Sequence, residues 1–235
     1  MAPITSVVIS LLLLECTVIH SEVFRYSEIN CPNQNFDLFH EITRARIFHE
    51  HNYLRTVLAS GTQQNGRTSV RFPTATNMSL LKYDCGLEEI AKNISKLCRK
   101  DFNHNFNFVG SNNATLDLPG TFIDWDLSHY VSDIVHEFIR EWWSASVSGA
   151  PLAADLTPTP ADGDMIPFLQ MANAATTRLG CGYTVCLSSN QRFLSFVCQY
   201  GEPHINVGVP IYKSGTPCSD CKKKCIFGLC ENEAD

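Results

Sequence analysis

The stretch DMIPFLQMANAATTRLGCGYTVCLSSNQRFLSFVCQYGEPHIN, residues 164–206, decides the fold. Two of its segments, Leu179–Leu187 and Arg192–Tyr200, are rich in β-branched and aromatic residues, and the polar turn Ser188–Gln191 separates them. This arrangement predicts a β-hairpin. Cys181 and Cys198 fall in the two facing strands, where the geometry permits a disulfide. We therefore expect a small disulfide-tied sheet with helices packed against it.

Apolar residues at helical spacing predict three helices outside this stretch. The first spans Phe36–Leu58, the second spans Gly86–Arg99 with Asp84 as its N-cap, and the third spans Ser128–Trp143. The apolar positions that define the first two helices are Leu38, Ile42, Ala45 and Phe48, and then Leu87, Ile90, Ala91, Ile94, Leu97 and Cys98. We expect irregular structure in residues 100–120, with a short strand or a core-capping loop around Phe102, Phe106 and Phe108, and a loop in residues 144–164.

Length and composition limit the classes of protein to which the chain can belong. Its 235 residues suit one or two domains, and a hydrophobic content of 44% is enough for a sizeable core. The formal net charge of −6 argues against a nucleic-acid surface, which needs clustered Lys and Arg. The one basic run is Lys222-Lys223-Lys224, and we interpret it as part of a solvated tail rather than as a heparin or lipid-headgroup site.

The start of the chain predicts export. Val7–Leu14 is an apolar segment of the length found in secretory signal peptides, and it is too short to span a bilayer. We assign residues 1–21 to a signal peptide and expect a secreted, extracellular protein without a transmembrane segment. Three Asn-x-Ser/Thr sequons, at Asn77, Asn93 and Asn113, suit N-glycosylation in the same compartment.

The cysteines predict a disulfide framework. Eleven are present, and Cys16 falls within the predicted signal peptide, which leaves an even number in an exported chain. We favour one bond from Cys181 to Cys198 across the hairpin, and one from Cys31 to Cys98 that ties an extended leader to the second helix. The pairing of the other six stays open: Cys85, Cys186, Cys218, Cys221, Cys225 and Cys230.

Several motifs resemble the two signatures of the CAP superfamily, which contains the cysteine-rich secretory, antigen 5 and pathogenesis-related proteins. They are Phe168-x-Gln170-Met171, then Thr-Thr-Arg-Leu-Gly-Cys-Gly at residues 176–182, and Val-Cys-Gln-Tyr at residues 197–200. The chain is similar to the nematode branch, called venom allergen-like or activation-associated secreted proteins, over residues 36–212. The resemblance implies an α+β fold, a three-layer α-β-α sandwich with a short antiparallel sheet. It also implies a CAP domain at residues 22–212, followed by a short cysteine-rich tail at residues 213–235.

The resemblance also shows what this chain has lost. CAP domains often carry two His and two Glu that converge on one cleft, as a metal or acid–base site requires. Carried over residue by residue, these positions are His104, Ser111, Ala145 and Pro167. Three of the four ligands are therefore absent, whereas Zn²⁺ needs three or four protein ligands. We expect no metal, no cofactor and no catalytic residue, and no Gly-x-Ser-x-Gly motif replaces the lost site.

The other histidines do not suggest a metal site either. His49 and His51 lie two residues apart, so they do not share a helix face. His136 begins a motif in which Arg140 stands where a zinc protease has its second His. His51 begins the segment His-Asn-x-x-Arg, whose role in CAP proteins is structural.

Two functions follow from the resemblance. The first is a lipid-binding parasite effector, with Leu152, Leu156 and Ile166 as candidates for a sterol loop. Ile139 and Trp143 are candidates for a fatty-acid groove between the first and third predicted helices, although both equally suit a place in the core. The alternative is an immunomodulatory protein that binds a host cell-surface protein without any lipid.

Overall fold

A computed structural model describes residues 29, 31, 41–100, 106, 109–120, 124–188 and 191–232. The predicted signal peptide lies outside the described residues, as do Leu38, Phe102 and Phe108. The central element is a four-stranded sheet in the order β1-β3-β4-β2, formed by Lys82–Tyr83, Arg178–Ser188, Gln191–Tyr200 and Ser111–Leu118. β2, β4 and β3 pair in antiparallel fashion, and β1 runs parallel to β3.

The predicted hairpin lies at the centre of this sheet. β3 and β4 pair from Leu179 opposite Tyr200 down to the turn, with Cys181 directly opposite Cys198. These two cysteines form the disulfide expected across the hairpin. The two longest strands are thus cross-linked to each other, and the other elements pack around them.

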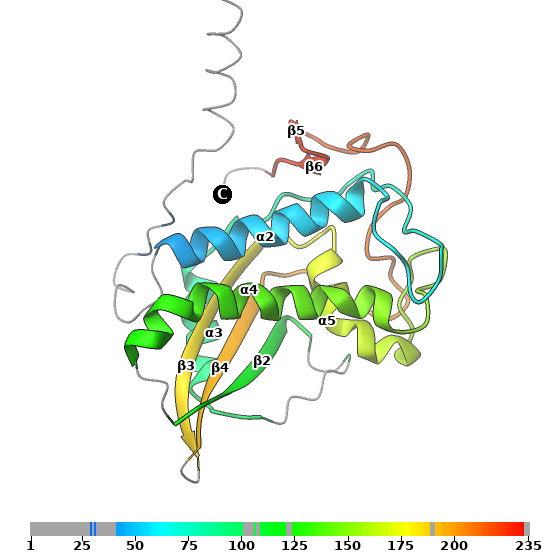
Figure 1. The fold of residues 1–235 in the computed structure, drawn as a ribbon. Helices are drawn as coiled ribbons and strands as arrows, with labels where there is room; N and C mark the ends of the chain where they lie inside the picture. The colour runs from blue at the N-terminus through cyan, green and yellow to red at the C-terminus, as the bar shows by residue number, and fades with distance from the viewer. Residues whose placement is uncertain are drawn as a thin grey trace, which may run out of the picture.

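Helices cover both faces of the sheet, so the fold has three layers (Figure 1). α3 (Cys85–Ser95) packs against β3 and β4 on one face. The other face carries α2 (Glu41–Ala59), α4 (Asp124–Ser148) and α5 (Ile166–Ala172), with the 3₁₀ turn η1 (Pro160–Met165) leading into α5. This confirms the predicted α+β three-layer sandwich. None of the described helices combines the length and apolarity needed to cross a bilayer.

α3 lies unusually close to β3 because the strand has glycine at the two points of contact. A Cβ atom on Gly180 would lie 2.2 Å from the backbone N of Glu88, and one on Gly182 would lie 2.7 Å from the backbone N of Lys92. Real Cβ atoms do not approach backbone atoms so closely, so any side chain at these positions would push the helix away from the sheet. The Gly-Cys-Gly segment therefore sets the distance between two layers of the fold.

This close approach decides which face of α3 is buried. The N-cap is Asp84, as predicted, and its Oδ1 accepts a hydrogen bond from the backbone N of Leu87 at 2.9 Å. The buried residues, however, are Glu88, Ala91 and Ser95, and the predicted apolar stripe is wrong in part. Leu97 is 64% exposed and Ile90 is also exposed, because the glycine-lined strand receives small and polar side chains.

The apolar pattern predicted α4 more accurately than α2. α4 begins and ends a few residues beyond the predicted helix, and its buried apolar residues recur at helical spacing: Leu127, Val131, Val135, Phe138 and Trp142. In α2, Ile42 is 73% exposed although the pattern placed it in the core. The buried face of α2 carries Arg44, His51 and Arg55 instead, and these polar residues interrupt the apolar spacing.

Two elements were not predicted from the sequence. β2 pairs with β4 over eight residues, Ser-Asn-Asn-Ala-Thr-Leu-Asp-Leu, although Asn and Asp are depleted in strands. α5 has Pro167 in its first turn, where proline is tolerated, and all seven of its residues are buried. A helix that is buried on every side shows no amphipathic period, so the sequence pattern did not reveal it.

Five disulfides join the ten remaining cysteines, and one expected pair is wrong. In addition to the hairpin bond, the tail contains Cys218–Cys225 and Cys221–Cys230. Cys31 does not pair with Cys98: it bonds to Cys85, and Cys98 bonds to Cys186 of β3. Cys85 begins α3 and Cys98 follows its end, so about 20 Å of helix axis separates them at about 1.5 Å per residue. Cys31 therefore bonds at the N-terminal end of α3, and Cys98, beyond the C-terminal end, bonds to β3.

Candidate functional site

The structure describes three of the four positions assigned to the family ligands. Pro167 is buried in α5, Ala145 lies on α4 against the core, and Ser111 begins β2. His104 lies outside the described residues. Proline and alanine side chains carry no ligand atom. Within the described ranges, no group of three or more His, Cys, Asp and Glu side chains is placed to hold a metal ion.

A buried hydrogen-bond network of uncharged groups lies beside Pro167. Asn112 of β2 donates from Nδ2 to the carbonyl O of Pro167 at 2.9 Å and to the hydroxyl of Tyr200 at 3.2 Å. His51 of α2 has Nδ1 at 2.8 Å from the carbonyl O of Ile47, so this nitrogen carries the proton. Its Nε2 then accepts from the Tyr200 hydroxyl at 3.0 Å. The network links α2, the sheet and α5.

Burial keeps this network neutral. The pKa of His51 is lowered to about 4, chiefly because burial disfavours the charged imidazolium. The pKa of Tyr200 is raised for the same reason, because burial disfavours the phenolate. Neither group changes its charge near neutral pH, so neither is suited to acid–base catalysis.

Gly110 and Gln170 complete the polar contacts between β2 and α5. The backbone N of Gly110 donates to Oε1 of Gln170 at 3.0 Å. Gly110 has φ of +102°, and a Cβ atom there would lie 2.6 Å from Cε1 of His204, so both backbone conformation and space favour glycine. Nε2 of Gln170 and Oδ1 of Asn112 are buried and have no partner within the described part of the chain. One is a neutral amide donor and the other a neutral amide acceptor. We interpret them as partners of a buried water molecule rather than as metal ligands.

The rest of the His-Asn-x-x-Arg segment is also structural. Arg55 donates to backbone carbonyls at 2.7–3.3 Å, and the acceptors are Ser79, Met171, Asn173 and Thr176. Asn52 exchanges two hydrogen bonds with the backbone of Leu81, at 2.9 and 3.2 Å. These buried side chains satisfy the backbone of irregular segments that have no strand or helix partner.

The predicted sterol-loop residues lie in the hydrophobic core. Leu152, Leu156 and Ile166 are all buried, and they belong to the same core cluster as the helices. Asn65 holds the backbone of Leu152 with two hydrogen bonds at 2.8 and 2.9 Å. The carbonyl O of Leu156 accepts from the backbone N of Ile211 at 3.1 Å. This loop is therefore fastened at both leucines, and its apolar side chains do not line an open cleft.

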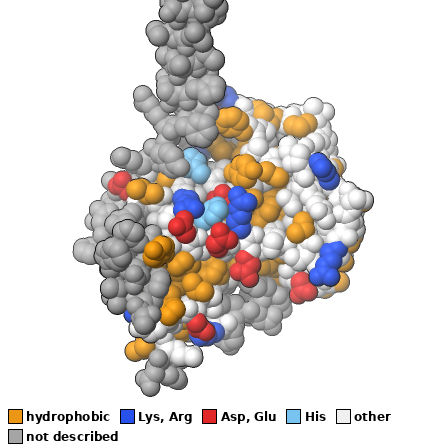
Figure 2. Space-filling model, in the orientation of Figure 1, with side chains coloured by type: hydrophobic (Ala, Val, Ile, Leu, Met, Phe, Trp, Pro, Cys, Tyr) orange, Lys and Arg blue, Asp and Glu red, His pale blue; other side chains and the backbone are white. Residues whose placement is uncertain are grey.

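The predicted fatty-acid groove is closed as well. Ile139 and Trp143 are buried in the core, and the Trp143 ring meets the Phe168 ring edge-on at 4.9 Å. Above them, ion pairs cross from α2 to α4. Glu50 lies 2.7 Å from Nε of Arg140 and 3.3 Å from Nε2 of His136. Figure 2 shows charged and His side chains gathered at the middle of the face that these two helices form.

Arg46 and Asp133 form a further ion pair between the same two helices. The side chain of His49 is exposed. His136 is a boundary residue that contacts Glu50 of α2, and its Nδ1 lies 3.7 Å from Oε1 of Glu137, the next residue of α4.

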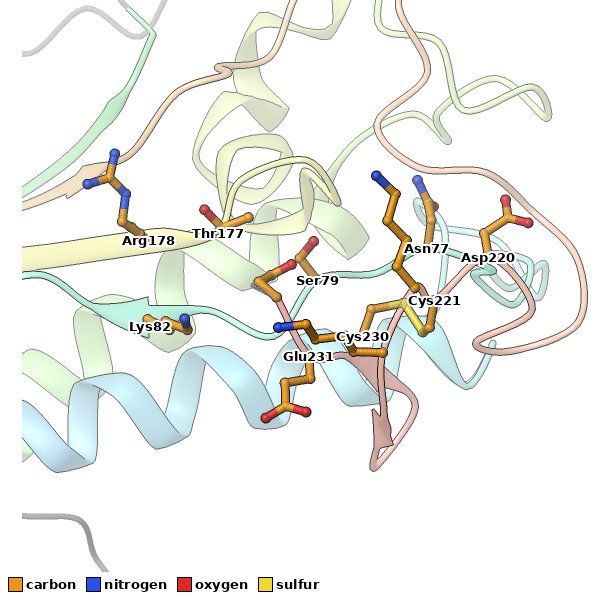
Figure 3. A pocket seen from close by; sticks show the side chains of 12 residues that line it. Asn77, Ser79, Lys82, Thr177, Arg178, Asp220, Cys221, Cys230 and Glu231 are labelled. Carbon is orange, nitrogen blue, oxygen red and sulfur yellow. A yellow bond between two sulfur atoms is a disulfide. The ribbon is translucent and has the colours of Figure 1, made fainter. Parts of the chain in front are cut away.

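A polar cleft of about 370 Å³ opens where the C-terminal tail packs against the start of the sheet (Figure 3). Backbone hydrogen bonds hold the tail there, from Leu80 N to Cys230 O at 2.8 Å and from Cys230 N to Met78 O at 2.7 Å. The lining residues are Asn77, Ser79, Lys82, Thr177, Arg178, Asp220, Cys221, Lys222, Lys223, Cys230, Glu231 and Asn232. No sequence pattern predicted that these segments meet, and the lysine run was interpreted as part of a solvated tail.

The three sequons differ in how accessible their asparagines are. Asn93 is exposed on α3, and Asn77 is half-buried at the rim of the polar cleft. Asn113 lies in β2 beneath α4, with its Oδ1 buried, and its backbone O accepts from Nε1 of Trp142 at 3.2 Å. Solvent access therefore favours a glycan on Asn93 over one on Asn113.

Comparison with known proteins gives one family. A family profile described as "CAP: Cysteine-rich secretory protein family" matches residues 48–200. A cysteine-rich venom protein of Tityus serrulatus is 27% identical over 207 residues, covering 82% of this chain and 46% of its own length. The Ancylostoma secreted protein of Ancylostoma caninum is 25% identical over 192 residues, covering 79% of this chain and 42% of its own length. The chain thus spans about half the length of these relatives.

Solved structures agree with this result. The structure of BmVAL-1 is 28% identical, has a TM-score of 0.70, and covers 88% of this chain and 100% of its own. A crystal structure described as NaASP2 with Zn²⁺ is 26% identical, has a TM-score of 0.62, and covers 86% of this chain and 100% of its own.

Proposed function

Since this chain belongs to the cysteine-rich secretory protein family, we propose that it is a secreted, non-enzymatic protein that acts by binding an extracellular partner at its surface. The venom and secreted proteins among its relatives support an extracellular setting. So do the five disulfides, because disulfides persist in oxidising compartments. The apolar segment at residues 7–14 suits the same destination.

The main support for this proposal is that side chains unable to bind a metal or transfer a proton stand at two of the family's ligand positions. Pro167 and Ala145 have no side-chain donor atom. The neighbouring His51–Tyr200–Asn112 network is buried and neutral. A hydrolytic or metal-dependent reaction needs an activated nucleophile, an acid–base pair or a Lewis acid, and these residues provide none of them.

We place a protein partner ahead of a lipid partner. To receive a sterol, the loop would have to withdraw Leu152 and Leu156 from the core, and each buried leucine contributes about 1.5–3 kcal/mol. To receive a fatty acid between α2 and α4, the contacts of Glu50 with His136 and Arg140 would have to open. A host cell-surface protein, bound by an immunomodulatory effector, needs neither change. Sterol or fatty-acid binding is the second candidate, supported by the family alone.

The test uses the full chain secreted from eukaryotic cells. Organic extracts of the purified protein are analysed by mass spectrometry for sterol and fatty acid, and the radiolabelled protein is titrated onto host cells with unlabelled competitor. We expect saturable cell binding and less than stoichiometric lipid. A stoichiometric sterol or fatty acid in the extract would reverse the order of the two candidates.

Two matched variants test whether the loop binds sterol or only contributes to the hydrophobic core. Changing Leu152, Leu156 and Ile166 together to Ser should lower the melting temperature sharply, since all three are in the core. Changing the exposed neighbours Ala153 and Ala154 to Ser should not. If the triple variant kept its melting temperature and lost only cholesterol binding, the sterol proposal would be correct.

A further inference from the structure

We propose that the polar cleft between the start of the sheet and the C-terminal tail binds a sulfated polysaccharide. The proposal names one class of partner for surface binding, and so it rests on the proposed function. Figure 3 shows Lys82 and Arg178 on the side of the cleft formed by the sheet, and the Cys221–Cys230 disulfide on the side formed by the tail. The lysine run that the sequence placed in a solvated tail thus lies at the edge of a cleft.

The charge of the cleft differs from that of the chain. The whole chain has a formal net charge of −6. The cleft lining has four cationic residues, Lys82, Arg178, Lys222 and Lys223, against the two acids Asp220 and Glu231. A positive cleft on a chain of net negative charge concentrates anions locally.

Part of this charge is already committed to contacts within the protein. Arg178 Nη1 lies 2.9 Å from Oδ2 of Asp84, so its charge is partly balanced. Asp220 Oδ2 accepts from Oγ1 of Thr76 at 3.0 Å and lies 3.6 Å from Nζ of Lys213, so it too is partly balanced. Lys222 and Lys223 are exposed at the opening. The tail thus supplies two exposed cations to the cleft, and Lys82 and Arg178 line the side formed by the sheet.

The tail is held in place before any ligand arrives. Cys221 and Cys230 are bonded on either side of the lysine run, and Cys218 bonds to Cys225. Asn232 adds a hydrogen bond from Nδ2 to the carbonyl O of Leu80 at 2.6 Å. Little backbone freedom remains to be lost on binding, and this distinguishes the run from a mobile basic tail.

Two of the remaining lining residues suit a saccharide. Ser79 and Thr177 offer hydroxyl groups, which match sugar hydroxyls. Cations on both walls match sulfate groups repeated along a polymer, with charge-assisted hydrogen bonds. A bilayer surface cannot enter a cleft, and a lone phosphate ion would leave one wall without a partner. We therefore assign the cleft to a sulfated polysaccharide rather than to a lipid headgroup or inorganic phosphate.

The experiment measures retention of the full secreted protein on immobilised heparin and its dissociation constant for heparin oligosaccharides. Lys222→Gln with Lys223→Gln removes two charges from the tail wall, and Lys82→Gln removes one from the sheet wall. The control is Lys92→Gln with Lys96→Gln, which also removes two positive charges, from α3 and its C-cap residue. We call it the α3 pair. We expect the tail pair to weaken binding at least tenfold, Lys82→Gln about threefold, and the α3 pair less than twofold.

Competition identifies the source of the anion. Desulfated heparin and inorganic phosphate should not displace the protein, and vesicles of phosphatidylserine and phosphatidylcholine should not bind it. If the tail pair and the α3 pair lowered the affinity for heparin equally, the binding would be non-specific electrostatic attraction. If the protein bound vesicles but was not retained on heparin, the cleft would be a lipid site. Either result would overturn the proposal. If the tail-pair variant still bound host cells saturably and bound heparin no differently from the unaltered protein, this site would be excluded and the proposed function would be unaffected.

Discussion

Single residues of the His-Asn-x-x-Arg segment show how polar side chains can be buried without forming an active site. Arg55 meets four backbone carbonyls, and its pKa is lowered to about 9 by burial, so it stays protonated at neutral pH. His51 stays neutral between Ile47 and Tyr200. Both residues satisfy buried polar groups, and neither faces a cleft.

His51 predicts a pH dependence of stability. Its folded-state pKa of about 4 is below the ordinary value of 6.5, so the unfolded chain binds a proton that the folded chain excludes between these values. The stabilisation is complete above pH 6.5 and is lost as pH falls towards 4, by up to about 3 kcal/mol. Urea unfolding at several pH values measures it. His51→Gln should be less stable at pH 7 and should show a shallower decline; an unchanged decline would refute the assignment.

At the scale of elements, the contact between α3 and β3 depends on two missing side chains. Gly180 and Gly182 allow the helix to lie on the strand, and the buried face of α3 then carries Glu88. Glu88 forms a pair of 2.7 Å contacts with Arg44 of α2 and accepts from the hydroxyl of Tyr83 at 2.6 Å. A glycine motif in one strand therefore determines how two helices are linked.

Gly180→Ala should destabilise the protein strongly. The new Cβ would lie 2.2 Å from backbone N of Glu88, and backbone cannot move aside as a flexible side chain can. We expect a loss of about 3 kcal/mol or more in the free energy of unfolding. Gly163→Ala is the matched control, because nothing lies within 4 Å of its Cβ position. Equal melting temperatures for the two variants would contradict this account of the layer spacing.

The small hairpin of the tail predicts a stabilising change. β5 (Cys225–Ile226) and β6 (Leu229–Cys230) are joined by Phe227 and Gly228, which have φ of +50° and +81°. Both values belong to a type I′ turn, which favours Asn-Gly, yet Phe227 is a bulky residue and is 69% exposed. Phe227→Asn should stabilise the fold by about 0.5–1 kcal/mol, since Asn tolerates this conformation.

Thermal unfolding measures the effect of this turn substitution. Phe227→Leu is the control, because leucine is also apolar and has the same backbone preference as phenylalanine. It should leave the melting temperature nearly unchanged. A gain from Leu equal to that from Asn would show that exposure of the ring, and not the turn, causes the effect.

At the scale of the whole molecule, the disulfides differ in how much of the chain they constrain. Cys98–Cys186 closes 88 residues of sequence separation and joins the end of α3 to β3, whereas Cys218–Cys225 closes seven within the tail. In the chain-entropy description, a longer closed loop restricts the unfolded chain more. The core bond should therefore contribute more than the tail bond.

Paired substitutions test this ranking. Replacing Cys98 and Cys186 by Ala should cost about 4–5 kcal/mol, and replacing Cys218 and Cys225 by Ala should cost about 2 kcal/mol. Denaturant unfolding gives both values. Peptide mapping under non-reducing conditions checks the pairing itself, and a peptide linking Cys31 to Cys98 would refute the connectivity described above.

The sequence by itself determined the features that depend on neighbouring residues. The β-branched and aromatic segments of Leu179–Tyr200, with the polar turn between them, predicted the hairpin. The period of Ser128–Trp143 predicted α4, and Asp84 predicted the start of α3. The quoted motifs identified the family, and Pro167 in place of a ligand was readable directly from them. Each of these signals lies within one short segment, so it needs no knowledge of what packs against it.

The tertiary structure alone decided which distant segments meet. It paired Cys31 with Cys85, because α3 separates its two ends, and it paired polar β2 with β4. It placed Leu152 and Ile139 in the core, and it brought Lys82 to the lysine run. Burial and partnership are properties of the packed chain: the same leucine or lysine has the same local pattern whether it faces a ligand, the core or solvent.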